Sequence, residues 1–400
     1  MTKTPIRVTR AITVPDPIRV ARAQRGPDLG PRILFFTGGT ALRETSQALV
    51  GYTHNSTHLV TPFDSGGSSA VLRQYFGMPA VGDMRSRLMA LADRSLHGFP
   101  EIYDLFAHRL PKTASPEQLQ TELQALVGGS HPLIARVLDP MRKIIRHHLQ
   151  LFEKSITADF DLRGASIGNL ILTAGYLENR RHIDPIVYIY SKLVQVRGQV
   201  RLVINADLQL RAVLENGAEI VGQHLITGKE TPPLSVPIRE LSLTDPARRG
   251  SCARPAVRDK IRAAITSSDL ICYPIGSFYS SLVANLLPAG IGQAVSQTPC
   301  PKVFIPNPGP DPEAIGLDLI GQVRVLLRHL RQDAPDAIAI GDILNFVLLD
   351  TNTVYPGPRQ LERELATMGI QVIRTPLVDP ADGRVQPHLL CQTLVSLAGT

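Results

Sequence analysis

Residues 32–40 read RILFFTGGT, and this stretch decides the fold. The run RILFFT is apolar and rich in β-prone residues, which predicts a short buried strand. Gly38 and Gly39 predict a turn, and the next ten residues, ALRETSQALV, have the pattern of a helix. Strand, glycine turn and helix together make the first half of a βαβ unit, so the sequence predicts an α/β protein.

The same alternation returns in the last third of the chain. DLICYPIG (269–276), KVFIPNPGP (302–310), DAIAIGDILNFVLLDT (336–351) and IQVIRTPLV (370–378) supply strand candidates, and helical segments separate them. Alternation of this kind predicts a Rossmann-like, mostly parallel sheet with helices on both faces.

Two segments interrupt this pattern, and one precedes it. Residues from about 95 to 162 look almost wholly helical, with Ser115 as an N-cap and Pro116 at the first helical position. Residues from about 186 to 245 are rich in β-branched side chains, and Asn216-Gly217 between two such runs predicts a hairpin. Residues 1–30 are Arg-rich and predict an N-terminal arm. We therefore expect one α/β domain over 31–400 with a helical and a β-rich insertion.

Composition limits the classes of partner. The 42 Lys and Arg residues outnumber 35 Asp and Glu by seven, and only eight of the 42 are Lys. Arginine-rich surfaces suit phosphates and carboxylates, since guanidinium is a planar, bidentate donor. Trp is absent and aromatic residues make up 5%, which leaves few platforms for stacked bases. We expect anionic small ligands and regard nucleic acid as an unlikely partner; a DNA-binding role of the basic arm is the alternative.

The sequence also indicates the compartment. The four cysteines are at least 20 residues apart with no CxxC pair, which is typical of free thiols in a reducing environment. No stretch of 18 apolar residues occurs. We expect a cytoplasmic protein with no membrane partner. The edge of the β-rich layer offers a surface through which a homo-oligomer could pair.

Four turns before helices share one chemistry. Each combines glycine with hydroxyl or amide side chains, and they lie at residues 38–40, 64–69, 166–170 and 276–280. Glycine lets backbone N–H groups approach an anion, and the helix dipole favours negative charge. The chain lacks both GxxxxGK[ST] and GxGxxG, so ordinary P-loop and dinucleotide sites are not expected. The expected phosphate-binding residues are Gly38, Gly39, Thr40, Gly66, Gly67, Ser68, Arg85, Gly168, Asn169, Gly276 and Ser277.

Two acidic residues belong to this region. Asp64 and Asp83 lie within or beside glycine turns, where carboxylates could hold Mg²⁺ against a diphosphate. The alternative is that each caps a helix. Arg73, Arg85 and Arg87 follow these turns and could clamp phosphate, or could be solvated surface residues. His131, His147 and His148 do not favour a metal site, because neighbours in sequence point to different faces of a helix.

Five ordered segments carry a family resemblance. They are FFTGGT, FDSGGSSAVLRQYFGMPAVGDMRSRLMALAD, GASIGNLIL, SSDLICYPIGSFYSSLVANLL and KVFIPN. In order and spacing they resemble the 2-phospho-L-lactate transferase (CofD-like) superfamily from Ile33 to Val378. The long second segment and the helical insertion look more similar to the bacterial gluconeogenesis-factor-like branch than to the transferases of coenzyme F420 synthesis.

The resemblance implies a Rossmann-like core and one of two activities. In the transferases a phospholactyl group passes from a guanosine diphospho-lactate donor to the terminal hydroxyl of a deazaflavin, with Mg²⁺. The bacterial branch is associated with binding of a nucleotide or nucleotide sugar and with regulation of central metabolism or the cell envelope. The resemblance places binding residues at Gly38, Gly39, Thr40, Asp64, Gly168, Asn169, Gly276, Ser277, Tyr279 and Asn307.

The chain departs from the family pattern at three places. Ala41 stands where a further glycine usually follows GGT, Ser65 replaces a second acid beside Asp64, and Pro274-Ile275-Gly276 replaces a GPG turn. A lost acid weakens cation binding, and a Cβ at position 41 crowds a phosphate. Two hypotheses therefore stand: an Mg²⁺-dependent transferase using a nucleotide-diphosphate donor, with Asp64 holding the metal, or a non-catalytic regulator binding a nucleotide or nucleotide sugar.

Overall fold

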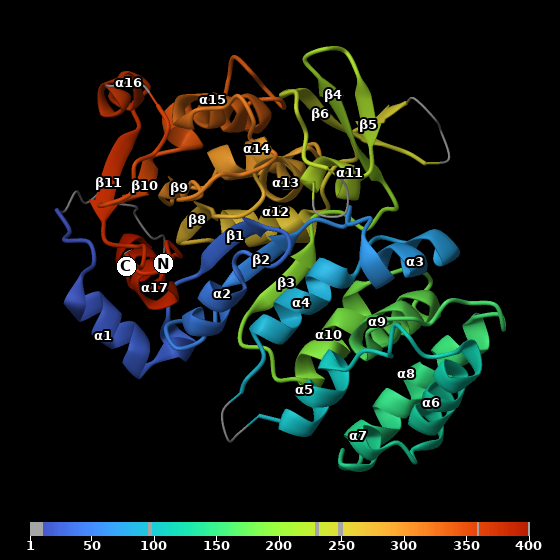
Figure 1. The fold of residues 1–400 in the computed structure, drawn as a ribbon. Helices are drawn as coiled ribbons and strands as arrows, with labels where there is room; N and C mark the ends of the chain where they lie inside the picture. Colours follow the sequence, from blue (N-terminus) through green and yellow to red (C-terminus); the bar gives the residue numbers. More distant parts are fainter. Residues whose placement is uncertain (1–10, 95–97, 229–231, 247–250, 358–359, 399–400) are drawn as a thin grey trace.

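The computed structural model describes residues 11–94, 98–228, 232–246, 251–357 and 360–398. A seven-stranded sheet forms its centre, and every neighbouring pair of strands is parallel (Figure 1). In spatial order the strands are β3 (Gln199–Leu202), β2 (Thr57–Val60), β1 (Ile33–Thr37), β8 (Leu270–Tyr273), β9 (Lys302–Phe304), β10 (Phe346–Asp350) and β11 (Gln371–Thr375). The predicted α/β class with a parallel sheet is confirmed.

The strand order reverses next to β1. The chain adds β2 and β3 on one side, returns to place β8 against the other side of β1, and then continues outward to β11. This is the order of a doubly wound sheet, in which ligands bind at the carboxyl ends of the strands where the order reverses. The position to examine is therefore the crevice between the ends of β1 and β8.

The side chains of β1 alternate between two cores. Leu34 and Phe36 belong to one core, whereas Ile33 and Phe35 belong to the core on the opposite face. All four are fully buried, as expected for a central parallel strand that is covered on both sides. The core of Leu34 includes residues of α12 (Asp259–Thr266), η2 (Phe278–Val283), α13 (Ala284–Leu286), α14 (Ile291–Ser296), α15 (Leu319–Leu330) and α16 (Leu361–Thr367). The core of Ile33 includes residues of α1 (Pro17–Arg25), α2 (Arg43–Leu49) and α17 (Pro387–Leu397).

The predicted helical insertion is helical over most of its described residues, 98–162; residues 95–97 lie outside the described part. Ser115 caps its second helix through a capping box, with Pro116 at the first position, as predicted. The insertion shares a third core with the helices that flank it. The helices of the insertion are α5 (Pro100–Ala107), α6 (Pro116–Gly128), α7 (Pro132–Ala135) and α8 (Met141–Ser155). The flanking helices are α3 (Gly67–Phe76), α4 (Gly82–Ala90), α9 (Ile167–Glu178) and α10 (Asp184–Leu193).

An antiparallel sheet forms the β-rich insertion. Its order is β5 (Glu219–Val221), β4 (Gln209–Leu214), β6 (Ile238–Thr244) and β7 (Cys252–Ala253), and β4 and β5 form the hairpin predicted at Asn216-Gly217. Residues 229–231 within it are not described. The short elements η1 (Pro27–Leu29), α11 (Gln223–Thr227) and η3 (Ile340–Asp342) complete the fold.

The prediction of β-structure from residue 186 is wrong at its start. Residues 186–193 belong to helix α10, and β3 belongs to the central sheet. The buried positions Ile186, Tyr190 and Leu193 have the i, i+4, i+7 spacing of a helix face, and Pro185 lies in its first turn. Packing on that face outweighs the β preference of the branched residues.

The predicted N-terminal arm is also corrected where the structure describes it. Asp16 caps helix α1, and the Asp16 backbone N–H donates to Ser396 Oγ at 2.8 Å. Arg19 donates to the Ser396 carbonyl at 2.8 Å, and Ala23 is buried. This segment is thus docked on helix α17; residues 1–10 lie outside the described part.

Helix packing gives a direct test of the fold. A Cβ at Gly292 in α14 would lie 1.8 Å from the Leu330 carbonyl oxygen, so α14 and α15 would have to separate. Gly292→Ala is expected to lower the free energy of unfolding by roughly 2–3 kcal/mol in chemical denaturation. Gly341→Ala is the matched control, because its Cβ position lies in open space, with no atom of the described residues outside its own turn within 4 Å. Equal stability of the two variants would contradict this packing.

Candidate functional site

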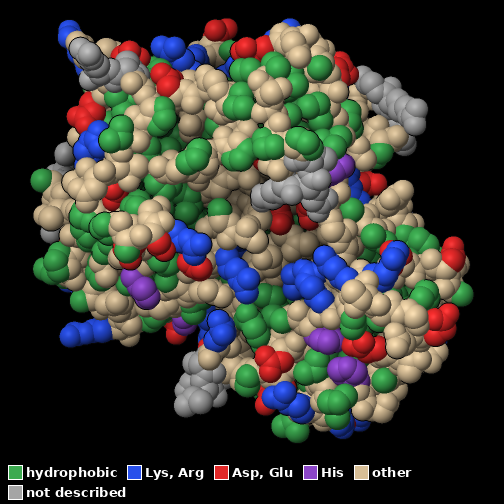
Figure 2. Space-filling model, in the orientation of Figure 1, with side chains coloured by type: hydrophobic (Ala, Val, Ile, Leu, Met, Phe, Trp, Pro, Cys, Tyr) green, Lys and Arg blue, Asp and Glu red, His purple; other side chains and the backbone are tan. Residues whose placement is uncertain are grey.

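A cavity of about 310 Å³ lies at the reversal point of the strand order. Its walls come from the turns after β1, β2 and β8, the start of α4, and α11 of the β-rich insertion. Figure 2 shows a hollow near the middle of this face, with acidic side chains inside it and Lys or Arg side chains along its lower edge. The lining residues that the sequence predicted are Gly38, Gly39, Thr40, Asp64, Gly66, Gly67, Asp83, Gly276 and Ser277.

Arg87 holds the turn after β1 in place. It extends from α4 beneath this turn, and its side chain is almost completely buried. Its guanidinium donates five hydrogen bonds, all to uncharged oxygens: Thr37 Oγ1 at 2.9 Å, Gly38 O at 3.1 Å, Gly39 O at 3.2 Å, Leu42 O at 2.8 Å and Ser46 Oγ at 2.5 Å. Arg87 is therefore a positioning residue beneath the cavity and not the solvated or clamping side chain expected from the sequence.

The preceding carbonyl of this turn is held from the other side. Asn285 of α13 donates to Thr37 O at 2.8 Å. The carbonyls of Thr37, Gly38 and Gly39 are thus all occupied by side chains from two helices. A turn fixed in this way is preorganised, so little conformational entropy is lost when a ligand binds to it.

Arg87 also affects the electrostatics of the cavity. Burial lowers its pKa to about 10, with Asp83 acting in the opposite direction. The side chain therefore remains cationic at neutral pH. A positive charge in a desolvated place beneath the turn is weakly screened, and it favours an anion at the cavity.

Two carboxylates lie on the cavity wall. Asp64 Oδ1 accepts the Gly66 N–H at 3.2 Å, while Oδ2 is 3.1 Å from the point where a Cβ of Gly82 would lie. Asp83 Oδ1 is 3.5 Å from the Cβ position of Gly39. The two acids thus come from adjoining segments and line one cavity with the glycine turn. Both are oxygen donors of the kind that Mg²⁺ prefers.

The turn after β8 does not work in the predicted way. Gly276 has a φ of 140°, which requires glycine, but the N–H groups around it are used within the protein. Asn307 accepts from Gly276 N at 2.8 Å and donates to Gly276 O at 2.7 Å, so it fixes the turn. Carboxylate oxygens of Asp311 and Glu313 accept the N–H groups of Phe278 and Ser280, each at 2.7 Å. Two acids already occupy the start of this helix.

Apart from Asn307, which fixes the turn after β8, five predicted site residues do not line the cavity: Ser68, Arg85, Gly168, Asn169 and Tyr279. The turn at 166–170 follows the helical insertion and not a strand, and none of its residues lines the cavity. A Cβ at Gly168 would be 2.6 Å from the Tyr190 hydroxyl, which explains this glycine by packing.

Contacts within the protein account for two of the other four, Ser68 and Tyr279. Ser68 Oγ accepts from Arg109 at 3.2 Å, and Tyr279 donates its hydroxyl to Ile238 O at 3.2 Å, joining η2 to the β-rich insertion. Burial raises the pKa of Tyr279 to about 12 and lowers the pKa of Arg85. Asn169 is buried at the start of α9.

The β-rich insertion contributes lining residues that the sequence did not indicate. They are Gln223, His224 and Thr227 of α11. His224 Nδ1 and Ser65 Oγ are 2.8 Å apart, and the His224 backbone N–H donates to the same oxygen at 3.0 Å. This contact joins segments 159 residues apart, so no local pattern could have predicted it.

A second cavity of about 680 Å³ shares one wall with the first. Thr40, Ala41 and residues 275–277 line both cavities, and Asn307 lies on the far side with Arg43 and Arg384. The volumes of both cavities fall in the range of small-molecule sites.

The described residues contain no helix with both the length and the apolar character needed to cross a membrane.

Removal of the Arg87 guanidinium tests its positioning role. Arg87→Met leaves several buried carbonyl and hydroxyl oxygens without donors, and it is expected to reduce the free energy of unfolding by roughly 2–5 kcal/mol. Arg22→Met, at an exposed position of α1, is the control and should change stability little. A small effect at Arg87, measured by urea denaturation, would disprove that role.

Comparison with known proteins gives a consistent assignment. The family model for 2-phospho-L-lactate transferase CofD matches residues 33–378. The chain is 29% identical over 378 residues to the gluconeogenesis factor of Bacillus subtilis, covering 92% of this chain and 98% of that protein. It is 31% identical over 310 residues to a putative gluconeogenesis factor of Nostoc, covering 77% of this chain but 54% of the relative. A crystal structure of a UPF0052 family protein from Bacillus halodurans matches with a TM-score of 0.64 and 22% identity, over 91% of this chain and 99% of that one.

Proposed function

The chain belongs to the 2-phospho-L-lactate transferase CofD family, and from this premise we propose that it binds a nucleotide diphosphate or a nucleotide-diphosphate conjugate between β1 and β8. The diphosphate occupies the 310 Å³ cavity, and the nucleoside or conjugated group extends into the adjoining 680 Å³ cavity. Thr40, Ala41 and Gly276 line both cavities, so the two cavities adjoin at these residues and one ligand could occupy both.

One observation carries this proposal: the buried Arg87 cation beneath the glycine turn. Arg87 and Asn285 occupy the carbonyls of this turn, which lines the cavity. A turn with its carbonyls held by buried donors and a positive charge beneath it supports an anionic ligand. The reversal of the strand order places this turn where doubly wound sheets bind their ligands.

Mg²⁺ fits the acidic wall. Asp64 and Asp83 offer carboxylate oxygens on one side of the cavity, opposite in charge to Arg87. We propose that they hold Mg²⁺, which neutralises charge on the diphosphate when bound. Asp64 also accepts the Gly66 N–H, and this bond orients its carboxylate.

As an enzyme the protein would transfer a phospholactyl-type group from the nucleotide donor to an acceptor hydroxyl: the hydroxyl oxygen would bond to the phosphorus of that group, the hydroxyl proton would pass to solvent, and the diphosphate bond would break to release the nucleoside monophosphate. The contributions of this chain would be positioning by the fixed turns and stabilisation of negative charge, with no covalent nucleophile. Gly39 and Thr40 would contact the diphosphate, and His224 would lie on the opposite wall.

A specific observation favours the second candidate, a non-catalytic regulator that binds a nucleotide or nucleotide sugar. The sequence resemblance implies an acid where this chain has Ser65, and the Ser65 hydroxyl contacts His224 of the β-rich insertion. Such an exchange reduces the negative charge available to a metal, and the contact joins the turn after β2 to α11, which lines the cavity. The curated relatives quoted above are also named gluconeogenesis factors.

Ligand binding is tested by thermal shift with guanine and uridine nucleotides and nucleotide sugars, with and without Mg²⁺. A ligand at a hundredfold excess over its Kd should stabilise the protein by about 2.7 kcal/mol and raise its Tm. Gly39→Ala should fold normally, because its Cβ meets Asp83 Oδ1 at an ordinary 3.5 Å, but should lose most of the shift. Gly26→Ala, with no atom within 4 Å of its Cβ position, is the control. If no phosphate-bearing ligand shifts the parent protein, both candidate functions fail.

Asp64→Asn then separates the two candidates. We expect the variant to retain nucleotide binding but to lose the additional Tm shift that Mg²⁺ produces, because one ligand charge is removed. Turnover of a nucleotide-diphosphate donor by the parent, and its loss in the variant, would support the transferase. Absence of turnover in the parent would favour the regulator, and an undiminished Mg²⁺ effect would contradict the metal assignment.

A further inference from the structure

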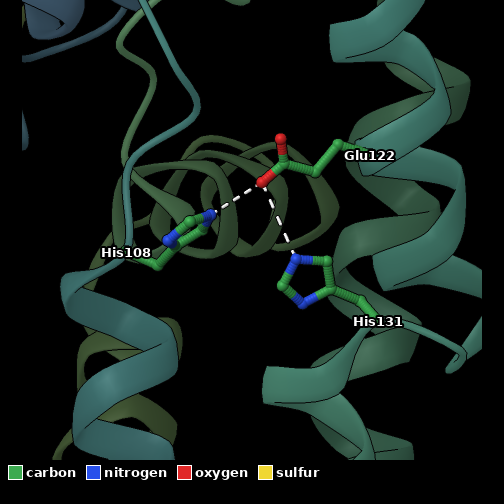
Figure 3. Close-up of side chains that lie close together, drawn as sticks. All are labelled: His108, Glu122 and His131. Carbon is green, nitrogen blue, oxygen red and sulfur yellow. Dashed lines mark hydrogen bonds and ion pairs between the residues drawn. The ribbon is translucent and has the colours of Figure 1, made fainter.

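Three side chains with metal-binding atoms converge in the helical insertion, apart from the cavity (Figure 3). His108 follows α5, Glu122 lies in the middle of α6, and His131 is the N-cap residue of α7. His108 Nε2 is 2.7 Å and His131 Nε2 is 3.7 Å from the same oxygen, Glu122 Oε1. One ligand atom from each residue lies within 4.8 Å of the other two.

The environment of the cluster is half-buried. The exposed fractions of the side chains are 29% for His108, 22% for Glu122 and 17% for His131. The two imidazole rings are tilted by 45° and both face the carboxylate. The three groups are thus shielded from bulk water on part of their surface, and an ion or a water molecule can still reach them.

We propose that His108, Glu122 and His131 form a binding site for Zn²⁺ or a similar divalent transition metal. Two imidazole nitrogens and one carboxylate oxygen are ligands that zinc accepts, whereas Mg²⁺ prefers oxygen alone. In a tetrahedral zinc site the ligand atoms are about 3.3 Å apart, as follows from metal–ligand distances near 2.0–2.1 Å. The separations of 2.7 and 3.7 Å from Glu122 Oε1 bracket this value, and all three ligand atoms lie within 4.8 Å of one another, so side-chain rotations can bring them to an ion. Water completes the coordination.

The charges of the site suit a dication. Zinc binds the neutral form of each imidazole and the ionised form of the carboxylate. The site then contains two neutral imidazoles and one carboxylate, and the ion changes its net charge from −1 to +1. No further acid of the described residues belongs to the group.

Metal binding requires a change of tautomer at His131. Its Nδ1 accepts the Leu133 N–H at 3.2 Å, so in the metal-free protein the proton of the neutral ring is on Nε2, directed to Glu122. Coordination through Nε2 moves this proton to Nδ1 and releases the Leu133 N–H to water. This hydrogen bond is long and caps a helix of four residues, so its loss is a modest cost.

The ion would join three segments. The end of α5, the middle of α6 and the start of α7 contribute one ligand each, and the His108 carbonyl accepts the N–H of Ile167 in α9. Zinc at this position would therefore stabilise the insertion and its junction with α9, as a structural metal does.

The other histidine group provides a matched control. His147 and His148 of α8 both approach Glu178, with His147 Nε2 at 3.2 Å and His148 Nε2 at 3.8 Å from its two oxygens. His147 is 54% exposed, and the three ligand atoms do not converge as those of His108, Glu122 and His131 do. His147→Gln removes a histidine from an ion pair with glutamate and should not affect zinc binding.

The full chain, freed of metal with a chelator, is titrated with Zn²⁺ by calorimetry, and bound zinc is counted by mass spectrometry after desalting. We expect one Zn²⁺ per chain from this site, and a loss of affinity of more than about tenfold in Glu122→Gln and His131→Gln. His147→Gln should bind like the parent. Equal binding by the parent and Glu122→Gln would place zinc elsewhere and overturn the proposal, as would absence of binding at micromolar Zn²⁺.

A second measurement works on the unsubstituted protein and does not depend on whether a variant folds. Imidazole ¹⁵N NMR should show the Nε2–H tautomer of His131 without metal and the Nδ1–H tautomer with Zn²⁺. A ring that keeps its proton on Nε2 in saturating Zn²⁺ would overturn the proposal. None of these outcomes depends on nucleotide binding.

Discussion

The buried guanidinium of Arg87 is the interaction on which the site depends. A cation in a protein interior is unfavourable unless its hydrogen-bonding groups are satisfied. Here the two terminal nitrogens donate five bonds to neutral oxygens, while the buried Nε has no partner among the described residues. Four of those oxygens belong to the turn after β1 or to its continuation into α2, so the bonds that stabilise the cation also hold the turn. The position of α4 relative to β1 follows from this network.

The two insertions contribute to the α/β domain in different ways. Helix α11 of the β-rich insertion lines the cavity, and its His224 contacts Ser65. Tyr279 of η2 donates its hydroxyl to Ile238 of the same insertion. The helical insertion has its own core, shared with α4 and α9. One insertion thus completes the cavity wall, whereas the other stabilises the helices behind it.

The sequence predicted the parts of the fold that depend on local pattern. The apolar run before Gly38 and the Asn216-Gly217 turn were sufficient for β1 and the hairpin, because neighbouring residues determine both. The helix at 186–193 was missed, since its β-branched residues fit a strand until the buried face is known. At the site, the glycine turns predicted which segments line the cavity, but they did not predict which side chains bond to the backbone of those turns. Nothing local shows that Asp311 and Glu313, more than thirty residues away, cap the helix after Ser277.

Ala41 and Ser65, where the sequence resemblance implies departures from the family pattern, each have a structural consequence. The Ala41 methyl lies on the wall shared by the two cavities, 3.7 Å from the Cβ position of Gly276, so it narrows the passage between them. Ser65 replaces a charge by a hydroxyl that contacts the insertion. Both changes leave Arg87 and the fixed carbonyls intact. The proposed anion binding would rest on Arg87 and these carbonyls, whereas the proposed metal-assisted transfer would depend on the acidic wall beside Ser65.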